Sequence, residues 1–150
     1  MQRACKEALA SAAKVATDRS IPVLDRIFMT QAAARPNPRS MSWVVDQLHR
    51  PQNALMHAKM HETMLKGLVP LLTAIVEEGI VAGVFSTNFP AESVEMALIY
   101  GVMAFDDEVF GSDGNLRSRR IQAFMYNLER IFGAAEGSMA HFAAFMAQQD

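Results

Sequence analysis

Apolar residues between positions 68 and 84 recur every three or four positions, which is the period of one face of an α-helix. They are Leu68, Leu71, Leu72, Ile75, Val76, Ile80 and Val84. Gly83 comes at the end of this pattern, where a residue in the left-handed conformation commonly caps a helix. Pro90 then suits the first position of a following helix, because its φ is already fixed at a helical value. This stretch therefore predicts two apolar helices joined by a tight turn.

The same periodicity, interrupted by proline and glycine, divides the rest of the chain into helices. We expect Ser20 to cap a second helix and Pro70 to kink or break the helix that contains it. Gly133 should end a helix over 115–132, and a last short helix should cover 139–146. No alternation typical of strands and no internal repeat is present. The sequence therefore predicts an all-α fold, a bundle of about six helices, and a single domain over 1–150.

Composition narrows the class of protein. Hydrophobic residues make up 51% of the 150, which excludes disorder, yet no apolar run reaches the roughly 20 residues of a membrane span. The N-terminus has no apolar core of a secretion signal, and the single cysteine, Cys5, cannot form an internal disulfide, so we expect a cytoplasmic protein. The net charge of −2 argues against binding of nucleic acid by this chain itself.

A mixed row of histidine and methionine marks the predicted helix that follows Pro51. His57 and His61 lie four residues apart, beside Met56, Met60 and Met64. Flexible thioethers suit the wall of a cavity for apolar ligands, and histidines supply orienting polar contacts. The same spacing also fits ordinary core methionines and a solvated histidine face. A third alternative is a divalent metal site, with Asp106 or Asp107 as a further ligand.

Signatures of catalysis are missing from the sequence. There is no G-x-S-x-G, phosphate-binding glycine loop or dinucleotide fingerprint, and 57–61 reads H-A-K-M-H, without the glutamate of H-E-x-x-H. We therefore expect neither an enzyme nor a bound cofactor.

Three motifs occur in the order found in one family. Residues 48–59 read L-H-x-x-x-N-A-L-x-H-x-K, residues 70–85 read P-L-x-x-x-I-x-x-x-G-x-x-x-G-V-F, and residues 128–138 read L-E-R-I-F-G-x-x-E-G-S. Together they resemble the ligand-binding half of TetR-type transcriptional regulators over about residues 1–138. Such regulators begin with a three-helix DNA-binding head. Nothing in this sequence resembles that head, so either the sequence is a C-terminal fragment or the natural protein lacks the head. We favour a fragment that acts on DNA only through a missing domain.

The resemblance implies a homodimer that senses a small, largely apolar effector and acts as a repressor by population shift. In this family the last two main helices form the dimer interface. The corresponding residues here are Leu98, Gly101, Val102, Phe105, Ile121, Phe124, Met125 and Leu128. These two helices could instead be a plain core pair. The residues that we predict to contact the effector are Trp43, His57, Met60, His61, Met64 and Phe105. The alternative from another class is a small helical metal- or cofactor-binding protein that uses His57 and His61.

Overall fold

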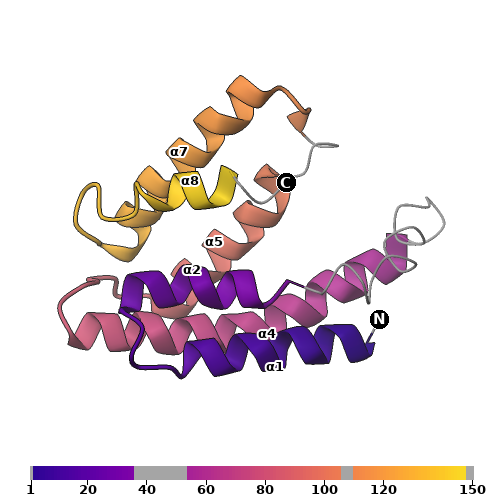
Figure 1. Cartoon of the computed structure of the whole chain (residues 1–150), viewed down its shortest axis with the longest axis horizontal. Helices are drawn as coiled ribbons and strands as arrows, with labels where there is room; N and C mark the ends of the chain where they lie inside the picture. Colours follow the sequence, from indigo (N-terminus) through magenta and orange to yellow (C-terminus); the bar gives the residue numbers. More distant parts are fainter. Residues whose placement is uncertain (1, 36–53, 106–109, 148–150) are drawn as a thin grey trace. The chain divides into compact units, whose positions relative to one another are not determined.

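The computed structural model describes residues 2–35, 54–105 and 110–147, and within them it contains six α-helices and no strand. The helices are α1 (Gln2–Ala16), α2 (Val23–Ala33), α4 (Ala54–Val81), α5 (Pro90–Ala104), α7 (Gly114–Phe132) and α8 (Phe142–Ala147) (Figure 1). The predicted all-α fold is confirmed. None of the described helices is long and apolar enough to cross a membrane. Trp43 lies outside the described residues, as do Asp106 and Asp107.

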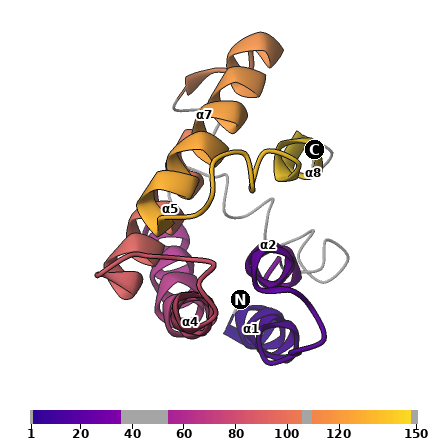
Figure 2. The same ribbon diagram turned by 90° about the vertical axis from the view of Figure 1, so that its left-hand side faces the viewer.

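The chain divides into two compact units, Met1–Ile75 and Val76–Asp150, with the boundary inside α4. In the first unit α1 and α2 form an antiparallel hairpin, and α4 up to Ile75 runs beside them (Figure 1, Figure 2). One face of α1 carries only small buried side chains, namely Cys5, Ala8, Ala12 and Ala16. Leu9 of α1 lies against Gly67 of α4, where an added Cβ would come 2.5 Å from both Leu9 methyl carbons. Small residues thus let these helices approach closely.

The start of α2 differs from the prediction that Ser20 caps it. The N-cap residue is Pro22, and no side chain caps the helix. Ser20 instead donates from its backbone N (3.0 Å) and its Oγ (2.6 Å) to Asp18 Oδ1. These hydrogen bonds, the one from the Ser20 hydroxyl foremost, lower the pKa of the Asp18 carboxyl. The cap prediction was wrong because Ser20 completes the turn before the helix, two residues too early.

Pro70 does not break α4, which is continuous from Ala54 to Val81. Proline removes one backbone donor, and its ring lies on the exposed side of the helix. On the opposite side Leu68, Leu72 and Ile75 are all buried. This apolar stripe extends on both sides of the proline, so its burial favours one continuous helix over two shorter ones. Of the two predicted alternatives at Pro70, a kink or a break, the break is therefore wrong.

In the second unit α5 and α7 pack as an antiparallel pair. Ser86 N donates to Phe132 O (2.9 Å), so the residues before α5 meet the end of α7. Pro90 occupies the first turn of α5, and Gly133 caps α7 with a φ of 63°, both as the sequence predicts. Gly83 likewise has a φ of 75° after α4. The buried apolar side chains of this unit include Phe85, Val94, Leu98, Ile121, Met125, Leu128, Phe132 and Met139.

Candidate functional site

Four side chains of α4, His57, Met60, His61 and Met64, form a row that we call the α4 row. At about 100° per residue they fall within an arc of about 100° on the helix surface. This arc continues the stripe of Leu68, Leu72 and Ile75 toward the N-terminal end of α4. The stripe changes along its length, because the leucine and isoleucine positions are buried while all four positions of the α4 row are half-buried.

The two histidines of the α4 row are four residues apart in the sequence, and their rings are also neighbours in space. Their ring centroids are 4.2 Å apart and the ring planes are inclined by 60°. Met60 and Met56, together with Ala4 of α1, are partly buried against hydrophobic side chains. The α4 row therefore combines imidazole nitrogens and thioether sulfurs on a surface that is neither core nor fully solvated.

The charged residues of the same stretch lie on the opposite side of α4. Glu62 pairs with Lys66 (2.5 Å) and with Lys59 (3.1 Å), all exposed. These lysines, Lys66 foremost, lower the pKa of the Glu62 carboxyl through hydrogen bonds and charge. The three charges satisfy one another, which leaves the α4 row without an ionised carboxylate on its own arc.

The other two predicted effector contacts do not lie in the described part of the first unit. Trp43 lies outside the described residues. Phe105 belongs to the second unit, where its ring meets Phe124 edge-on at 5.6 Å and the Arg117 guanidinium lies 6.0 Å from its centre. Among the residues that the structure describes, no three His, Cys, Asp or Glu side chains are placed to hold a metal ion together.

Four of the predicted interface residues, Leu98, Ile121, Met125 and Leu128, are buried against their own chain. Gly101, Phe105 and Phe124 are half-buried, and Val102 is exposed. The exposed apolar residues of α5 form a different stripe, Met96, Ile99, Tyr100 and Met103, which we call the α5 face. Their exposed fractions lie between 47% and 60%. The sequence marked α5 as apolar nearly all round, but it did not distinguish the side that its own chain covers from the side left open.

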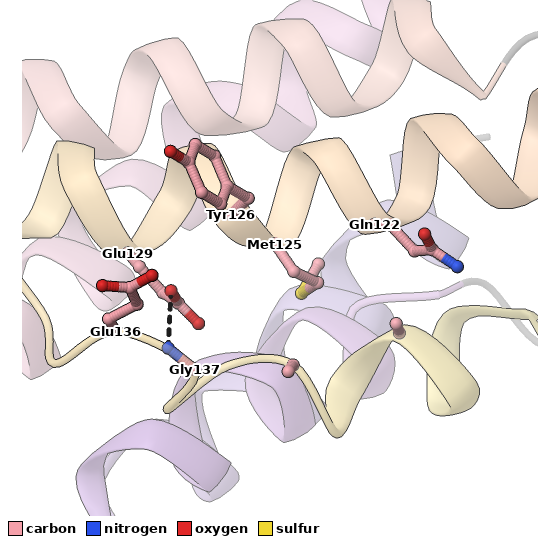
Figure 3. Close-up of a pocket in the computed structure, with 8 residues that line it drawn as sticks. Gln122, Met125, Tyr126, Glu129, Glu136 and Gly137 are labelled. Atoms are coloured by element: carbon pink, nitrogen blue, oxygen red, sulfur yellow. Dashed lines mark hydrogen bonds between the residues drawn. The ribbon is translucent and has the colours of Figure 1, made fainter.

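A hollow of about 260 Å³ lies between α7 and α8 (Figure 3). Its lining is mostly apolar and consists of Gln122, Met125, Tyr126, Glu129, Glu136, Gly137, Ala140 and Ala143. The sequence analysis did not identify this hollow. The only signal for it was the motif around Glu129 and Glu136, whose spacing gives no hint that a carboxylate is buried.

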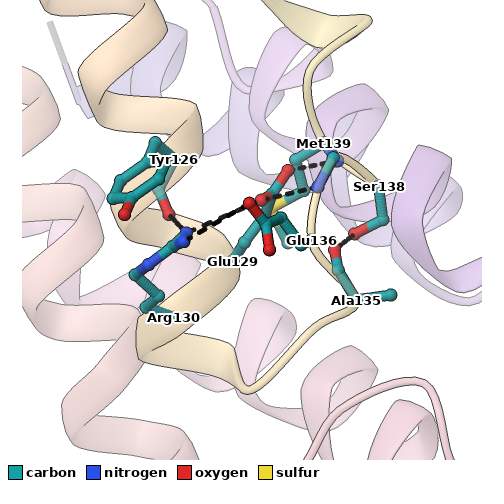
Figure 4. Close-up of polar contacts among 8 residues, drawn as sticks. Tyr126, Glu129, Arg130, Ala135, Glu136, Ser138 and Met139 are labelled. Carbon is teal, nitrogen blue, oxygen red and sulfur yellow. Dashed lines mark hydrogen bonds and ion pairs between the residues drawn. The ribbon is translucent and has the colours of Figure 1, made fainter.

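Glu129 is 3% exposed and bonds to the segment that joins α7 to α8. Its Oε2 accepts from Gly137 N and its Oε1 accepts from Met139 N, both at 2.9 Å (Figure 4). Arg130 lies beside it, donates to Tyr126 O (2.9 Å) and stacks 3.2 Å from the centre of the Tyr126 ring. Glu136, 4.0 Å from Arg130, is 85% exposed on its side chain. Both oxygens of Glu129 thus have backbone donors, so this carboxylate fixes the connecting segment.

The fold and these surfaces define an all-α domain with a paired-helix face and a separate helix that bears half-buried, ligand-type side chains. Residues 39–127 match the family described as the tetracyclin repressor-like, C-terminal domain. The match covers more than half of the chain, which therefore belongs to this family of regulator domains. Domains of this family belong to transcriptional regulators, which are generally not enzymes. Neither the curated proteins nor the solved structures include a match to the chain.

Proposed function

We propose that the chain is the effector-sensing and homodimerisation domain of a TetR-type transcriptional regulator. The observation that carries this proposal is the family match over 39–127, which includes α4, α5 and most of α7. In the proposed mechanism the chain contacts DNA only through a head domain outside this sequence. The effector favours one arrangement of the sensing helices and so changes the affinity for DNA. In this proposal residues 1–150 act as one domain of a cytoplasmic repressor.

The α5 face supports dimerisation through the α5–α7 pair. A contiguous stripe of exposed methionine, isoleucine and tyrosine side chains is typical of a surface that another protein covers. A second copy of the chain is the occupant that the family suggests, and two-fold symmetry would place the same face on both partners. Within one chain, Tyr100 of α5 and Phe124 of α7 form an aromatic contact between these two helices, with ring centroids 5.5 Å apart.

This arrangement revises the residues that we expect at the interface. Leu98, Ile121, Met125 and Leu128 are buried within their own chain and are therefore not available to a partner. Met96, Ile99, Tyr100 and Met103 would contact the partner, with Val102 and the edge of Phe124 beside them. A Cβ at Gly101 would lie 3.6 Å from the Phe124 ring, an ordinary van der Waals distance, so the packing of these two helices would accept an alanine there.

The α4 row is the proposed effector contact. Half-buried methionines adapt to varied apolar shapes, and the two imidazoles orient a polar group of the ligand. Trp43 and Phe105 remain predicted effector contacts. The proposed effector is therefore small and largely apolar, with one hydrogen-bonding group.

Native mass spectrometry of the purified chain tests the proposal. We expect the mass of two chains, and an organic adduct would identify an effector directly. The double variant Ile99→Glu/Met103→Glu should give a monomer, because it places two charges of the same sign on each copy of the buried face. Val81→Glu is the matched control, since Val81 is a 90% exposed apolar residue outside the α5 face. The control should remain a dimer.

Two outcomes would overturn the dimer assignment. One is a monomeric wild-type chain at micromolar concentration. The other is a dimer that survives in Ile99→Glu/Met103→Glu, which would place the interface on another surface. Circular dichroism of each variant must match the wild type, so that a change of mass reports association rather than unfolding.

A further inference from the structure

The α4 row presents four neutral, soft or borderline donors on one arc of a helix. We propose that it binds one soft monovalent metal ion of the Cu(I) and Ag(I) class. The ligands would be imidazole nitrogens of His57 and His61 and thioether sulfurs of Met60 and Met64. This inference goes beyond the proposed function, because it assigns a metal ion to residues proposed above to contact an organic effector.

The geometry of the helix brings the donors together. Residues three and four apart on a helix are neighbours, with Cβ atoms about 5–6 Å apart. His57 is followed by Met60 and His61 at these two spacings, and Met64 stands in the same relation to His61 and Met60. The imidazole rings are already only 4.2 Å apart, inclined rather than stacked. Rotation about side-chain bonds, without movement of the backbone, can therefore direct donors from adjacent turns at one ion.

The donor set selects the class of ion. Thioether sulfur is a soft ligand that favours Cu(I), whereas Mg²⁺ and Ca²⁺ require oxygen ligands that the α4 row does not have. Structural zinc sites use four thiolate, imidazole or carboxylate ligands, and among the described residues no group of three such side chains is placed to form one. Two imidazoles alone are a poor zinc site. With two thioethers added they become a complete set for a soft ion.

On the stretch of α4 that bears the α4 row, the one acidic side chain, Glu62, does not share the arc of the row. Burying a charge is costly, and a monovalent ion costs less than a divalent one when all its ligands are neutral. The nearest carboxylate along the helix, Glu62, faces the other side and is paired with Lys59 and Lys66. Half-burial also keeps the α4 row open to an ion from solution, whereas Leu68 and Leu72 farther along the same stripe are buried.

Silver nitrate titration, followed by native mass spectrometry and by histidine NMR signals, tests the site, because Ag(I) is a redox-stable probe of this class. The main variant is Met60→Leu/Met64→Leu, a volume-conserving change that removes both sulfurs and should preserve the fold. The matched control is Met29→Leu/Met146→Leu, which removes two thioethers outside the α4 row and the α5 face. Cys5→Ser removes the single thiol of the chain, which is a further soft group.

We expect one Ag(I) per wild-type chain, with shifted ring signals of both His57 and His61. Removing a group that only hydrogen-bonds to a metal ligand typically lowers metal affinity by about 10–100-fold. Removing two direct ligands should therefore weaken Ag(I) binding at least about 100-fold. The Met29→Leu/Met146→Leu control and Cys5→Ser should bind Ag(I) like the wild type. His57→Gln should weaken binding as well, because it removes an imidazole and leaves the sulfurs.

Three results would overturn the metal site. These are no Ag(I) binding by the wild type, unchanged binding by Met60→Leu/Met64→Leu, and loss of binding in Cys5→Ser. None of them bears on the proposed dimer, because the chain mass is read in the same spectra independently of any adduct. Conversely, a monomer that binds Ag(I) through the α4 row would refute the dimer and keep the metal site.

Discussion

Replacing Glu129 by glutamine should destabilise the chain much more than its conservative chemistry suggests. The Glu129 carboxylate accepts two backbone N–H groups, those of Gly137 and Met139, at 2.9 Å each. A glutamine amide of the same shape can accept only one of them, and its NH₂ group would face the other donor. The substitution therefore leaves one buried N–H without an acceptor and turns the other bond from charge-assisted to neutral.

The magnitude follows from these two losses. A hydrogen bond to a charged group contributes about 1.5–3 kcal/mol, and a buried donor without a partner costs about 1–3 kcal/mol. Because the two effects overlap, we expect Glu129→Gln to lower the free energy of unfolding by about 2–4 kcal/mol. This is a large share of the roughly 5–15 kcal/mol that stabilises a typical protein.

Urea denaturation at pH 7 measures the effect, and amide hydrogen exchange locates it. The denaturation midpoint should fall with little change in slope, and the amides of Gly137 and Met139 should exchange faster than in the wild type. Glu136→Gln is the control, because Glu136 is 85% exposed on its side chain and lies 4.0 Å from Arg130. An exposed ion pair of this kind contributes little, so the control should change stability by less than about 0.5 kcal/mol. Equal effects of the two substitutions would refute the assignment of Glu129 as the group that fixes the segment between α7 and α8.

Four further substitutions test other parts of the fold. Gly133→Ala should lower the free energy of unfolding, measured by thermal unfolding, by about 2–4 kcal/mol. The alanine backbone would have to adopt a left-handed conformation, and its Cβ would meet Ser86 Oγ and lie 3.1 Å from the Ser86 backbone. Gly83→Ala should cost only about 1–2 kcal/mol, since its φ is also positive but no atom lies within 4 Å of the added Cβ; equal costs would mean that the Ser86 contact contributes nothing. Gly67→Ala gains about 1 kcal/mol of helix propensity and loses about 1–3 kcal/mol by crowding Leu9, so we expect a small net loss that shrinks when Leu9 is also changed to Val. Glu62→Gln should reduce the acid dependence of stability: the folded chain holds the Glu62 pKa below its usual value, so its contribution is present above that value and disappears as pH falls through the lowered pKa. High salt should remove the difference between Glu62→Gln and the wild type, and a difference that persists in high salt would contradict this origin.

The sequence predicted those features of the fold that depend on the backbone preferences of single residues. Pro90 in the first turn of α5, Gly83 after α4 and Gly133 after α7 all occupy the predicted places. Each of these residues directs the backbone through its own φ, so its place in the fold can be predicted without knowledge of its neighbours in space. Ser20 and Pro70 failed as signals because they depend on competing partners, Asp18 for the first and a long buried stripe for the second.

Features that depend on which surface the chain covers could not be predicted in the same way. Apolar spacing made both Leu98 and Ile99 candidates for burial, yet the first is buried by its own chain and the second is exposed. The partners of Glu129 are backbone groups eight and ten residues farther along, and backbone groups leave no trace in the residue pattern. The α4 row was predicted as a row because helical spacing alone determines it, whereas Phe105 belongs to a different unit.

The buried face of α1 makes Cys5 a natural reporter of opening in the first unit. It is the single cysteine of the chain and is buried, so a thiol reagent in solution can react with it only when that part of the protein opens. At low reagent concentration the labelling rate gives the equilibrium between closed and open forms, in the same way as amide exchange. Any ligand that binds only the closed form must slow the labelling in proportion to its occupancy. The rate of Cys5 labelling in the unmodified protein can therefore report ligand binding even when the ligand is not known in advance.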